Sequence, residues 1–288
     1  MPDVDLTDED GSRATIAPER GGVLRRFARP TRQGIVDVLQ DPPGSPVMFP
    51  IAGFSHADGQ PDRYRWDGEV RPMPIHGFAM RLPWRQVERD RSSVRLELGP
   101  GEATGAAYPF AFRLVLSYAL DRGCLRTALE VENVGDRPMP FSTGFHPYVR
   151  LPLTPAGRRE RCVVRLPACR EYVARPEGIV AEPGRTPRKL AATAPAAPAR
   201  HFADLETLHA DLVDELSGLR VSLDATLDSS FRCLTAWSPQ ADAPFYCIEP
   251  RSALQDAFSY GGLQLTVLAP GATFAAGMTL ALHDDAGR

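Results

Sequence analysis

The stretch Phe112–Asn133, FRLVLSYALDRGCLRTALEVEN, contains two apolar, alternating segments on either side of Asp121-Arg122-Gly123. Period-two alternation interrupted by a short polar turn with glycine is typical of a β-hairpin. The same arrangement occurs upstream, where Trp84–Arg89 and Ser93–Leu98 flank a short polar turn. These segments predict neighbouring antiparallel strands.

Similar short segments recur along the chain, separated by glycine, proline, aspartate and asparagine. The chain contains 28 prolines and 24 glycines, spread in a way that fits many tight connections between short strands. Near the end, Leu263–Leu268 and Thr273–His283 flank Ala269-Pro270-Gly271, which predicts a further hairpin closing the sheet. The chain is therefore expected to be all-β.

Two segments depart from this pattern. The run Arg175–Arg200 is rich in proline and alanine with little apolar periodicity, so we interpret it as a long surface loop. In Asp204–Leu216, leucines recur at helix-like spacing, and here a helix competes with a strand.

Composition favours an ordinary globular chain that acts on small molecules. The 288 residues are 43% hydrophobic and 24% charged, with a formal net charge of -3. Basic and acidic residues are intermixed, so neither a nucleic acid nor a membrane is expected as a partner. The acidic N-terminus lacks the features of a secretory signal, and no apolar run is long enough to span a membrane, which predicts a cytoplasmic location. The five cysteines form no CxxC pair and are expected to be reduced and mostly buried.

Three segments place ionisable groups beside glycine, proline and aromatic residues: MPIHGFAMRLPW at 73–84, STGFHPYVRL at 142–151 and FYCIEPRSALQDAF at 245–258. If the second is extended, His146 shares a face with Gly144 and Tyr148, since side chains alternate along a strand. In the third, Glu249 shares a face with Cys247 and Arg251. An imidazole and a carboxylate in such apolar surroundings are candidates for acid and base chemistry.

Each candidate also has a structural interpretation. His76 and His146 could be satisfied core or loop histidines, and Glu249 could be a strand-end carboxylate paired with Arg251. A metal site built from His56, His76, His146 and Glu249 is disfavoured because no two of these residues have a short ligand spacing. A nucleophilic Cys247 is disfavoured because the sequence offers no activating partner.

Taken together, the three segments resemble the aldose 1-epimerase, or galactose mutarotase-like, family. The resemblance rests on Gly21-Gly22, on Phe49–Gly53, on His76-Gly77-Phe78, on Gly144–Tyr148 and on Glu249-Pro250, in this order. The segment Gly144–Tyr148, GFHPY, is the most specific. The resemblance covers the chain from about Ile16, so residues 1–15 are expected to be a flexible N-terminus and residues 16–288 a single domain.

This resemblance implies a β-supersandwich with two large antiparallel sheets and a concave sugar-binding cleft. By similarity, His146 is the catalytic acid, Glu249 the catalytic base, and His76 a second histidine that contacts the sugar. Apart from the resemblance, the aromatic residues Phe78, Tyr148 or Trp237 are candidates for an apolar floor beneath the sugar ring. The family also uses an acidic residue between the HPY segment and the late glutamate, for which Asp204 is the candidate.

One departure from the family concerns the sugar pocket. Many members carry a G-R-x-x-N-R segment shortly before the His-Gly motif, whereas this chain has Gly53–Gly59, GFSHADG, without arginine. Arg81 is the candidate for the missing cation, and His56 or Asp58 for a contact with a hydroxyl group.

The expected activity is aldose 1-epimerisation, with an imidazolium at His146 and a carboxylate at Glu249 that favour each other's charged forms. No cofactor and no metal are expected, and the chain could be a monomer or a homodimer. Two alternatives remain. One is a mutarotase for hexose 6-phosphates, with Arg81, Arg150 or Arg251 binding the phosphate. The other is a non-catalytic carbohydrate-binding protein of the same fold.

Overall fold

A computed structural model describes residues 2–175, 178–182, 188–194, 196–225, 230–259 and 265–284. Strands dominate these residues, and every pairing between named strands is antiparallel, which confirms the all-β prediction. The helical segments described are single turns: η1 (Pro18–Arg20), η2 (Ala79–Arg81), α1 (Glu102–Gly105) and η3 (Arg159–Arg161).

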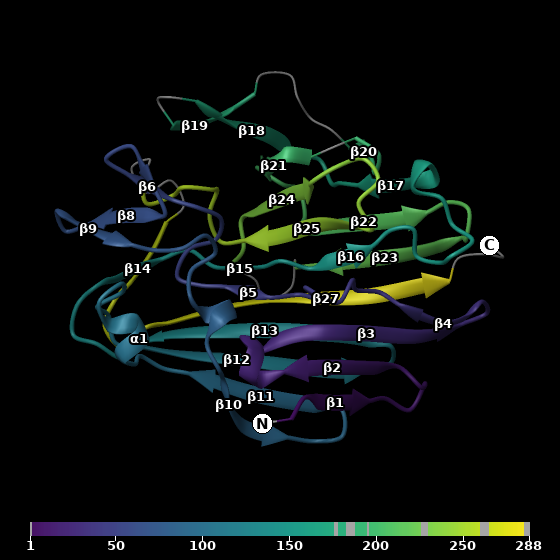
Figure 1. Ribbon diagram of the computed structural model, residues 1–288, viewed down its shortest axis with the longest axis horizontal. Helices are drawn as coiled ribbons and strands as arrows, with labels where there is room; N and C mark the ends of the chain where they lie inside the picture. Colours follow the sequence, from purple (N-terminus) through teal and green to yellow (C-terminus); the bar gives the residue numbers. More distant parts are fainter. Residues whose placement is uncertain are drawn as a thin grey trace.

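The largest sheet in the described part of the chain has nine strands (Figure 1). Both hairpins predicted upstream of residue 134 lie in it, because β10 pairs with β11 and β12 with β13. In spatial order its strands are β10 (Arg85–Arg89), β11 (Ser93–Leu98), β12 (Phe112–Asp121), β13 (Cys124–Asn133), β27 (Thr273–Asp284), β23 (Leu219–Asp224), β22 (His209–Asp214), β17 (Cys162–Arg165) and β20 (Lys189–Ala191).

An eight-stranded sheet forms the second large layer and carries the motif segments. Its strands are β19 (Gly178–Ala181), β18 (Arg170–Arg175), β21 (Ala196–Ala203), β24 (Cys233–Ser238), β25 (Phe245–Arg251), β15 (Gly144–Phe145) and β5 (Val47–Met48), with β16 (Tyr148–Arg150) paired to β25. The GFHPY strands therefore lie directly beside the strand of Glu249. Two large antiparallel sheets match the architecture that the resemblance implied.

A four-stranded sheet lies alongside β10–β13 (Figure 1). It is joined to them by hydrogen bonds such as that from the Arg89 guanidinium of β10 to the Asp5 carbonyl, 3.2 Å. Its strands are β1 (Val4–Thr7), β2 (Arg13–Ala17), β3 (Val23–Thr31) and β4 (Gly34–Asp37). Three two-stranded sheets complete the described fold. Two are hairpins, β6 (His56–Ala57) with β7 (Gln60–Pro61) and β8 (Arg63–Trp66) with β9 (Glu69–Pro72), and the third is a long-range pair, β14 (Met139–Phe141) with β26 (Thr266–Leu268).

The alternation seen in the sequence separates core from solvent. In β13, Leu125 and Leu129 are fully buried, whereas Arg126 and Glu130 between and beyond them are exposed. Apolar side chains from all the larger sheets join one contiguous cluster that extends along the chain from Val4 to Leu282. Burying each large apolar side chain stabilises the fold by about 1.5–3 kcal/mol.

The N-terminal residues differ from the expectation of a flexible segment at 1–15. Val4 pairs with Ile16 and Thr7 with Arg13, and the side chains of Val4 and Leu6 are buried in the core cluster. The short alternating segment VDLT is followed by a polar turn and a second strand, which is the pattern of a β-hairpin. The many acidic residues of this segment favoured a flexible terminus instead. The structure thus begins before the boundary predicted at Ile16.

The predicted C-terminal hairpin is wrong in its pairing. Strand β27 lies between β13 and β23 in the nine-stranded sheet, while β26 pairs with β14. The turn between β26 and β27 forms as predicted, but its two arms belong to different sheets, because both find longer-range partners. Leu263 and Gln264 of the predicted arm lie outside the described residues.

The remaining interpretations are partly corrected. Within Asp204–Leu216 the structure has strand β22 and no helix, since Ala210 and Leu212 alternate with less buried residues toward the core. Residues 178–181, 189–191 and 196–200 of the supposed surface loop belong to strands of both large sheets. Residues 176–177, 183–187 and 195 of that loop lie outside the described part.

Candidate active site

A cavity of about 1050 Å³ lies against the eight-stranded sheet and gathers residues of all three motif segments. The elements around it are β16, β18, β21, β24 and β25, together with the loop that contains the His-Gly motif. Its lining is Gly53, Phe54, His56, Ile75, His76, His146, Tyr148, Glu171, Tyr172, Val173, Pro198, Ala199, Arg200, His201, Trp237, Glu249, Arg251, Gln255 and Asp256. Such a size lies at the upper end of the range of small-molecule sites.

The GFHPY segment holds His146 rigidly between β15 and β16. The backbone N–H of His146 donates to the Pro46 carbonyl at 3.0 Å, and Phe145 on the opposite face is buried against Phe231. The imidazole stacks on the Tyr148 ring at a centroid distance of 4.5 Å and an interplanar angle of 6°. The predicted shared face of His146 and Tyr148 is therefore present, with the apolar anchor behind it.

Glu249 comes from the middle of the sheet, where β25 is flanked by β24 and β16. Its side chain is 1% exposed, and its two oxygens have different partners. The Arg251 guanidinium donates to Oε2 through Nη2 and through Nε, the latter at 3.1 Å. Oε1 lies 3.5 Å from His146 Nε2. The carboxylate is thus held on one side by a cation and faces the imidazole on the other.

The His-Gly motif is a tight turn in left-handed backbone geometry. His76 has φ 64° and Gly77 φ 72°, and a Cβ at Gly77 would lie 2.1 Å from the Phe49 carbonyl oxygen, so only glycine fits there. The backbone N–H of Gly53 donates to His76 Nδ1 at 3.1 Å. Because Nδ1 accepts, the neutral ring carries its hydrogen on Nε2. The His76 ring lies 5.0 Å from that of His146, edge to face.

Burial and nearby positive charge lower the pKa values of His76 and His146. Burial, followed by the charges of His146 and Arg251, lowers the pKa of His76 to about 3. Burial and the Arg251 charge likewise lower the pKa of His146 to about 3. The expectation that Glu249 and His146 favour each other's charged forms is therefore wrong for the histidine, because Arg251 already neutralises the carboxylate. At neutral pH the resting site contains a neutral imidazole.

Tyr148 and Trp237 line the cavity as predicted, with ring centroids 6.0 Å apart. His56 also lines the cavity. Its ring Nδ1 lies 3.1 Å from Asp256 Oδ2. Phe78 is instead buried in the core beside Phe49 and away from the cavity.

Three sequence candidates lie elsewhere. Arg81 is exposed at η2 and donates to the Gly77 carbonyl, so it is not the cavity's cation. Asp58 is exposed and pairs with Arg65. Asp204 is exposed beside β18, where it accepts a hydrogen bond from the Tyr172 hydroxyl at 2.9 Å, and it does not line the cavity. These three positions were chosen by their place along the chain, which did not determine where their side chains point.

The structure adds polar residues that the sequence did not single out. Glu171, 3% exposed, accepts two hydrogen bonds from Arg200, at 2.7 and 2.9 Å. Glu171 lines the cavity and lies between the HPY segment and Glu249 in the chain. His201 is 4% exposed, with Nδ1 3.0 Å from the Thr235 hydroxyl. Asp256 lies within the quoted segment 245–258, whereas nothing local marks Glu171 or His201.

The described residues hold no group of three or more histidine, cysteine, aspartate or glutamate side chains suited to a metal ion. All five cysteines are free, and Cys162, Cys169, Cys233 and Cys247 are buried as expected. Burial raises the pKa of the Cys247 thiol well above its usual value. Nor does the described part contain a helix long and apolar enough to cross a membrane.

Comparison with known proteins gives one consistent result. The family model described as aldose 1-epimerase matches residues 2–281. The chain is 26% identical to the chromosomal protein LacX of Lactococcus lactis subsp. lactis over 237 residues, 76% of this chain and 77% of LacX. It is 25% identical to the uncharacterized protein YphB of Escherichia coli K12, covering 94% and 96% of the two chains.

Among solved structures, a galactose mutarotase-like protein from Lactobacillus casei superimposes with a TM-score of 0.82 at 25% sequence identity, covering 98% of this chain and 100% of the other. The order of the motif segments, the two large sheets and the match over nearly the whole length agree. This chain belongs to the aldose 1-epimerase family.

Proposed function

We propose that this protein is an aldose 1-epimerase, a mutarotase that interconverts the α and β anomers of an unphosphorylated aldose. One observation carries the proposal: a buried carboxylate, Glu249, and an imidazole, His146, face each other at 3.5 Å within a cavity that has aromatic walls. Mutarotation needs one group that removes a proton from the anomeric hydroxyl and one that delivers a proton to the ring oxygen.

In the proposed mechanism Glu249 Oε1 accepts the proton of the anomeric hydroxyl and passes it across the 3.5 Å that separate them to Nε2 of the neutral His146 ring. The imidazolium formed in this way donates the proton to the ring oxygen as the bond between C1 and the ring oxygen breaks, and the open-chain aldehyde forms. Glu249 is then again a carboxylate and His146 again a neutral imidazole. After rotation about the C1–C2 bond, the same transfers run in reverse on the other face of the carbonyl.

The neutral state of His146 suits this relay. With a pKa of about 3, the ring exists at pH 7 as a neutral imidazole that carries one hydrogen, so it does not act as an acid before the substrate reacts. Its acidity is supplied at the moment of reaction by the proton that Glu249 removes from the substrate. Positioned proton transfers of this kind typically contribute about 10²–10⁴-fold each.

Arg251 fits the place of the family's missing arginine. Its Nη1 donates to the Ala52 carbonyl at 3.4 Å and would lie 3.0 Å from a Cβ at Gly53, within the segment where relatives carry G-R-x-x-N-R. By holding Oε2 it leaves Oε1 as the basic oxygen. We assign it the positioning of the Glu249 carboxylate, with His76 Nε2–H as a donor to a sugar oxygen.

The cations of the cavity favour a free sugar over a hexose 6-phosphate. Each of its two arginines is matched by a buried carboxylate, Arg251 by Glu249 and Arg200 by Glu171. A phosphate dianion would need positive charge that is not already neutralised. Of the arginines considered for this role, Arg81 and Arg150 do not line the cavity. Tyr148 and Trp237 instead offer flat apolar surface to a sugar ring.

The test is polarimetric mutarotation of α-glucose, α-galactose and other aldoses, with glucose 6-phosphate as the charged comparison. The variants Glu249→Gln and His146→Asn preserve shape while removing the base and the relay, and each should lower the rate constant about 10²–10⁴-fold. Glu88→Gln, an exposed carboxylate on β10, is the matched control and should leave the rate unchanged.

A folded wild-type protein that accelerates none of the aldoses, but binds one in calorimetry, would replace this proposal with a non-catalytic carbohydrate-binding protein. Acceleration confined to glucose 6-phosphate would overturn the assignment of a free sugar. Full activity in Glu249→Gln would overturn the mechanism.

A further inference from the structure

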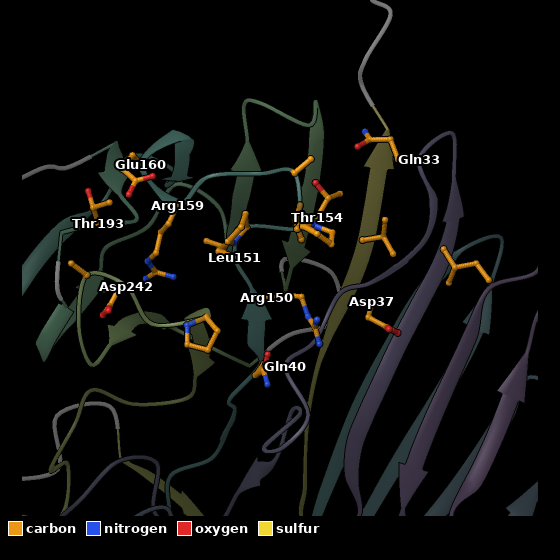
Figure 2. A pocket seen from close by; sticks show the side chains of 18 residues that line it. Gln33, Asp37, Gln40, Arg150, Leu151, Thr154, Arg159, Glu160, Thr193 and Asp242 are labelled. Carbon is orange, nitrogen blue, oxygen red and sulfur yellow. The ribbon is translucent and has the colours of Figure 1, made fainter.

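A second cavity, of about 860 Å³, lies away from the candidate active site, between the end of β4, the segment that follows β16 and the turn η3 (Figure 2). Figure 2 shows the guanidinium groups of Arg150 and Arg159 well apart, directed to different parts of this cavity. The Arg159 guanidinium donates to the carbonyls of Ala243 and Phe245 and to the Ser238 hydroxyl, so its hydrogen bonds serve the fold. Polar atoms that are free to meet a ligand lie instead in the candidate active site.

His201 is a residue of the candidate active site that has no role in the proposed proton transfers. It is 4% exposed and lines the cavity, and its Nδ1 lies 3.0 Å from the Thr235 hydroxyl. No described residue forms a hydrogen bond with His201 Nε2. This atom is also not among the seven enclosed side-chain polar atoms that lack a partner in the described part of the chain. Nε2 is therefore open to the cavity, where a ligand can reach it.

Strand pairing places His201 and Glu249 on the same face of the eight-stranded sheet. His201 on β21 lies directly opposite Thr235 on β24, and Thr235 lies directly opposite Glu249 on β25. Residues opposite each other in antiparallel strands project to the same side. Two strand spacings, about 9–10 Å at the backbone, separate His201 from Glu249. The fully buried Thr235 bonds to the imidazole from the strand between them, so the His201 ring is held toward Glu249.

His201 and His146 lie on opposite sides of Glu249. His146 follows β15 and precedes β16, which pair with β25 on one side, whereas β24 and β21 lie on its other side. In the proposed reaction Glu249 faces the anomeric hydroxyl and His146 faces the ring oxygen. Because C1 is bonded to both the ring oxygen and C2, a sugar placed in this way directs C2 away from His146 and toward His201.

We propose that His201 Nε2 binds the hydroxyl group on C2 of the aldose, and that Thr235 positions the imidazole for this contact. In this role His201 selects the substrate of the proposed epimerase, on which the assignment rests. Burial, followed by the Arg251 charge, lowers the pKa of His201 to about 3, so the ring is neutral at pH 7. A hydroxyl group can both donate and accept, and it can therefore pair with Nε2 in either tautomer.

The preferred substrates are then aldoses with a C2 hydroxyl, such as glucose and galactose, over their 2-deoxy analogues. Loss of that hydroxyl leaves Nε2 unpaired in a closed cavity, and sites built to bind a hydroxyl discriminate strongly against analogues that lack it.

Polarimetric kinetics with glucose, galactose, 2-deoxyglucose and 2-deoxygalactose test the proposal. The 6-deoxy analogue of galactose serves as a comparison sugar that lacks a different hydroxyl. His201→Ala removes the contact, Thr235→Val removes the positioning hydroxyl at nearly constant shape, and His201→Gln retains an amide that can reach the place of Nε2. His209→Ala, a half-buried histidine on β22 that does not line the cavity, is the matched control.

We expect His201→Ala to lower kcat/KM for the accepted 2-hydroxy aldose by about tenfold or more, and to leave kcat/KM for its 2-deoxy analogue nearly unchanged. Thr235→Val should show the same dependence on the sugar with a smaller loss, and His201→Gln should recover part of the activity. His209→Ala should match wild type with every sugar. A merely structural role of His201 would lower kcat/KM for all sugars alike.

Equal losses for the 2-hydroxy and 2-deoxy sugars in His201→Ala would overturn the proposal, as would a loss that disappears with the 6-deoxy sugar instead. A protein that binds these aldoses without turning them over would refute the proposed epimerase activity alone. The dissociation constants from calorimetry, compared between the same variants and sugars, would then decide the C2 contact.

Discussion

Replacing Arg251 by methionine tests the electrostatic arrangement on which the candidate active site depends. The Arg251 and Glu249 side chains are 3% and 1% exposed, so the pair is almost completely removed from water. Arg251→Met keeps most of the apolar stem but leaves the Glu249 carboxylate without its cation. Removing one partner of such a buried pair destabilises a protein by about 3–5 kcal/mol, because the remaining charge is left uncompensated.

The free energy of unfolding can be measured by urea denaturation followed by circular dichroism, with the slope m compared between variants. Arg65→Met provides a matched control, because Arg65 and Asp58 form an ion pair with side chains 46% and 66% exposed. Exposed pairs contribute less than about 1 kcal/mol, so this variant should be nearly as stable as wild type. The double variant Glu249→Gln with Arg251→Met removes both charges and should recover part of the lost stability.

A loss in Arg251→Met no larger than that in Arg65→Met would refute this reasoning. It would mean that water or another group compensates Glu249, and that Arg251 does not hold the carboxylate. A double variant less stable than Arg251→Met would also contradict it, since then the buried charge would not be the source of the cost.

Two further predictions concern stability. Burial, followed by the Arg251 charge, lowers the pKa of His201 from 6.5 to about 3. Between these two pH values the unfolded chain binds a proton at His201 and the folded chain does not. The free energy of unfolding therefore decreases as pH falls from about 6.5 toward 3, by about 1.4 kcal/mol per pH unit for each such histidine. His201→Gln should flatten the slope of unfolding free energy between pH 6 and 4 by that amount, and an unchanged slope would show that His201 is protonated in the folded state. Gly144→Ala should cost about 1–3 kcal/mol, because its Cβ would lie 2.6 Å from the Pro250 carbonyl oxygen; thermal unfolding at wild-type temperature would contradict the close approach of β15 to β25.

The sequence was sufficient to predict the strands whose alternation is local. The β10–β11 and β12–β13 hairpins follow from period-two patterning around short polar turns, and the faces of His146 and Glu249 follow from the same alternation. Arg251 was already expected to share the face of Glu249. The family resemblance, resting on GFHPY and the His-Gly motif, was sufficient for the overall architecture.

Pairing over long distances could not be read in the same way. Strand β27 lies between β13 and β23, and β26 pairs with β14, because each strand takes the partner that best buries its apolar face. A local turn signal contains no information on such partners. The same limit explains why Asp204 was chosen and Glu171 was not: both lie between the two motifs in the chain, but only β18 places its side chain in the cavity.

By itself, then, the sequence determined an all-β chain with an imidazole and a carboxylate on strands beside rigid glycine and proline, because strand periodicity and turn chemistry are properties of neighbouring residues. Only the tertiary structure decided the charge state of that site. In the folded protein His146 is buried near Arg251, and Arg251 donates to Glu249. The Arg200 guanidinium donates to Glu171. Burial and the distances between charges depend on how segments far apart in the chain pack together. These two quantities determine the pKa of an ionisable group and the cation with which a carboxylate pairs.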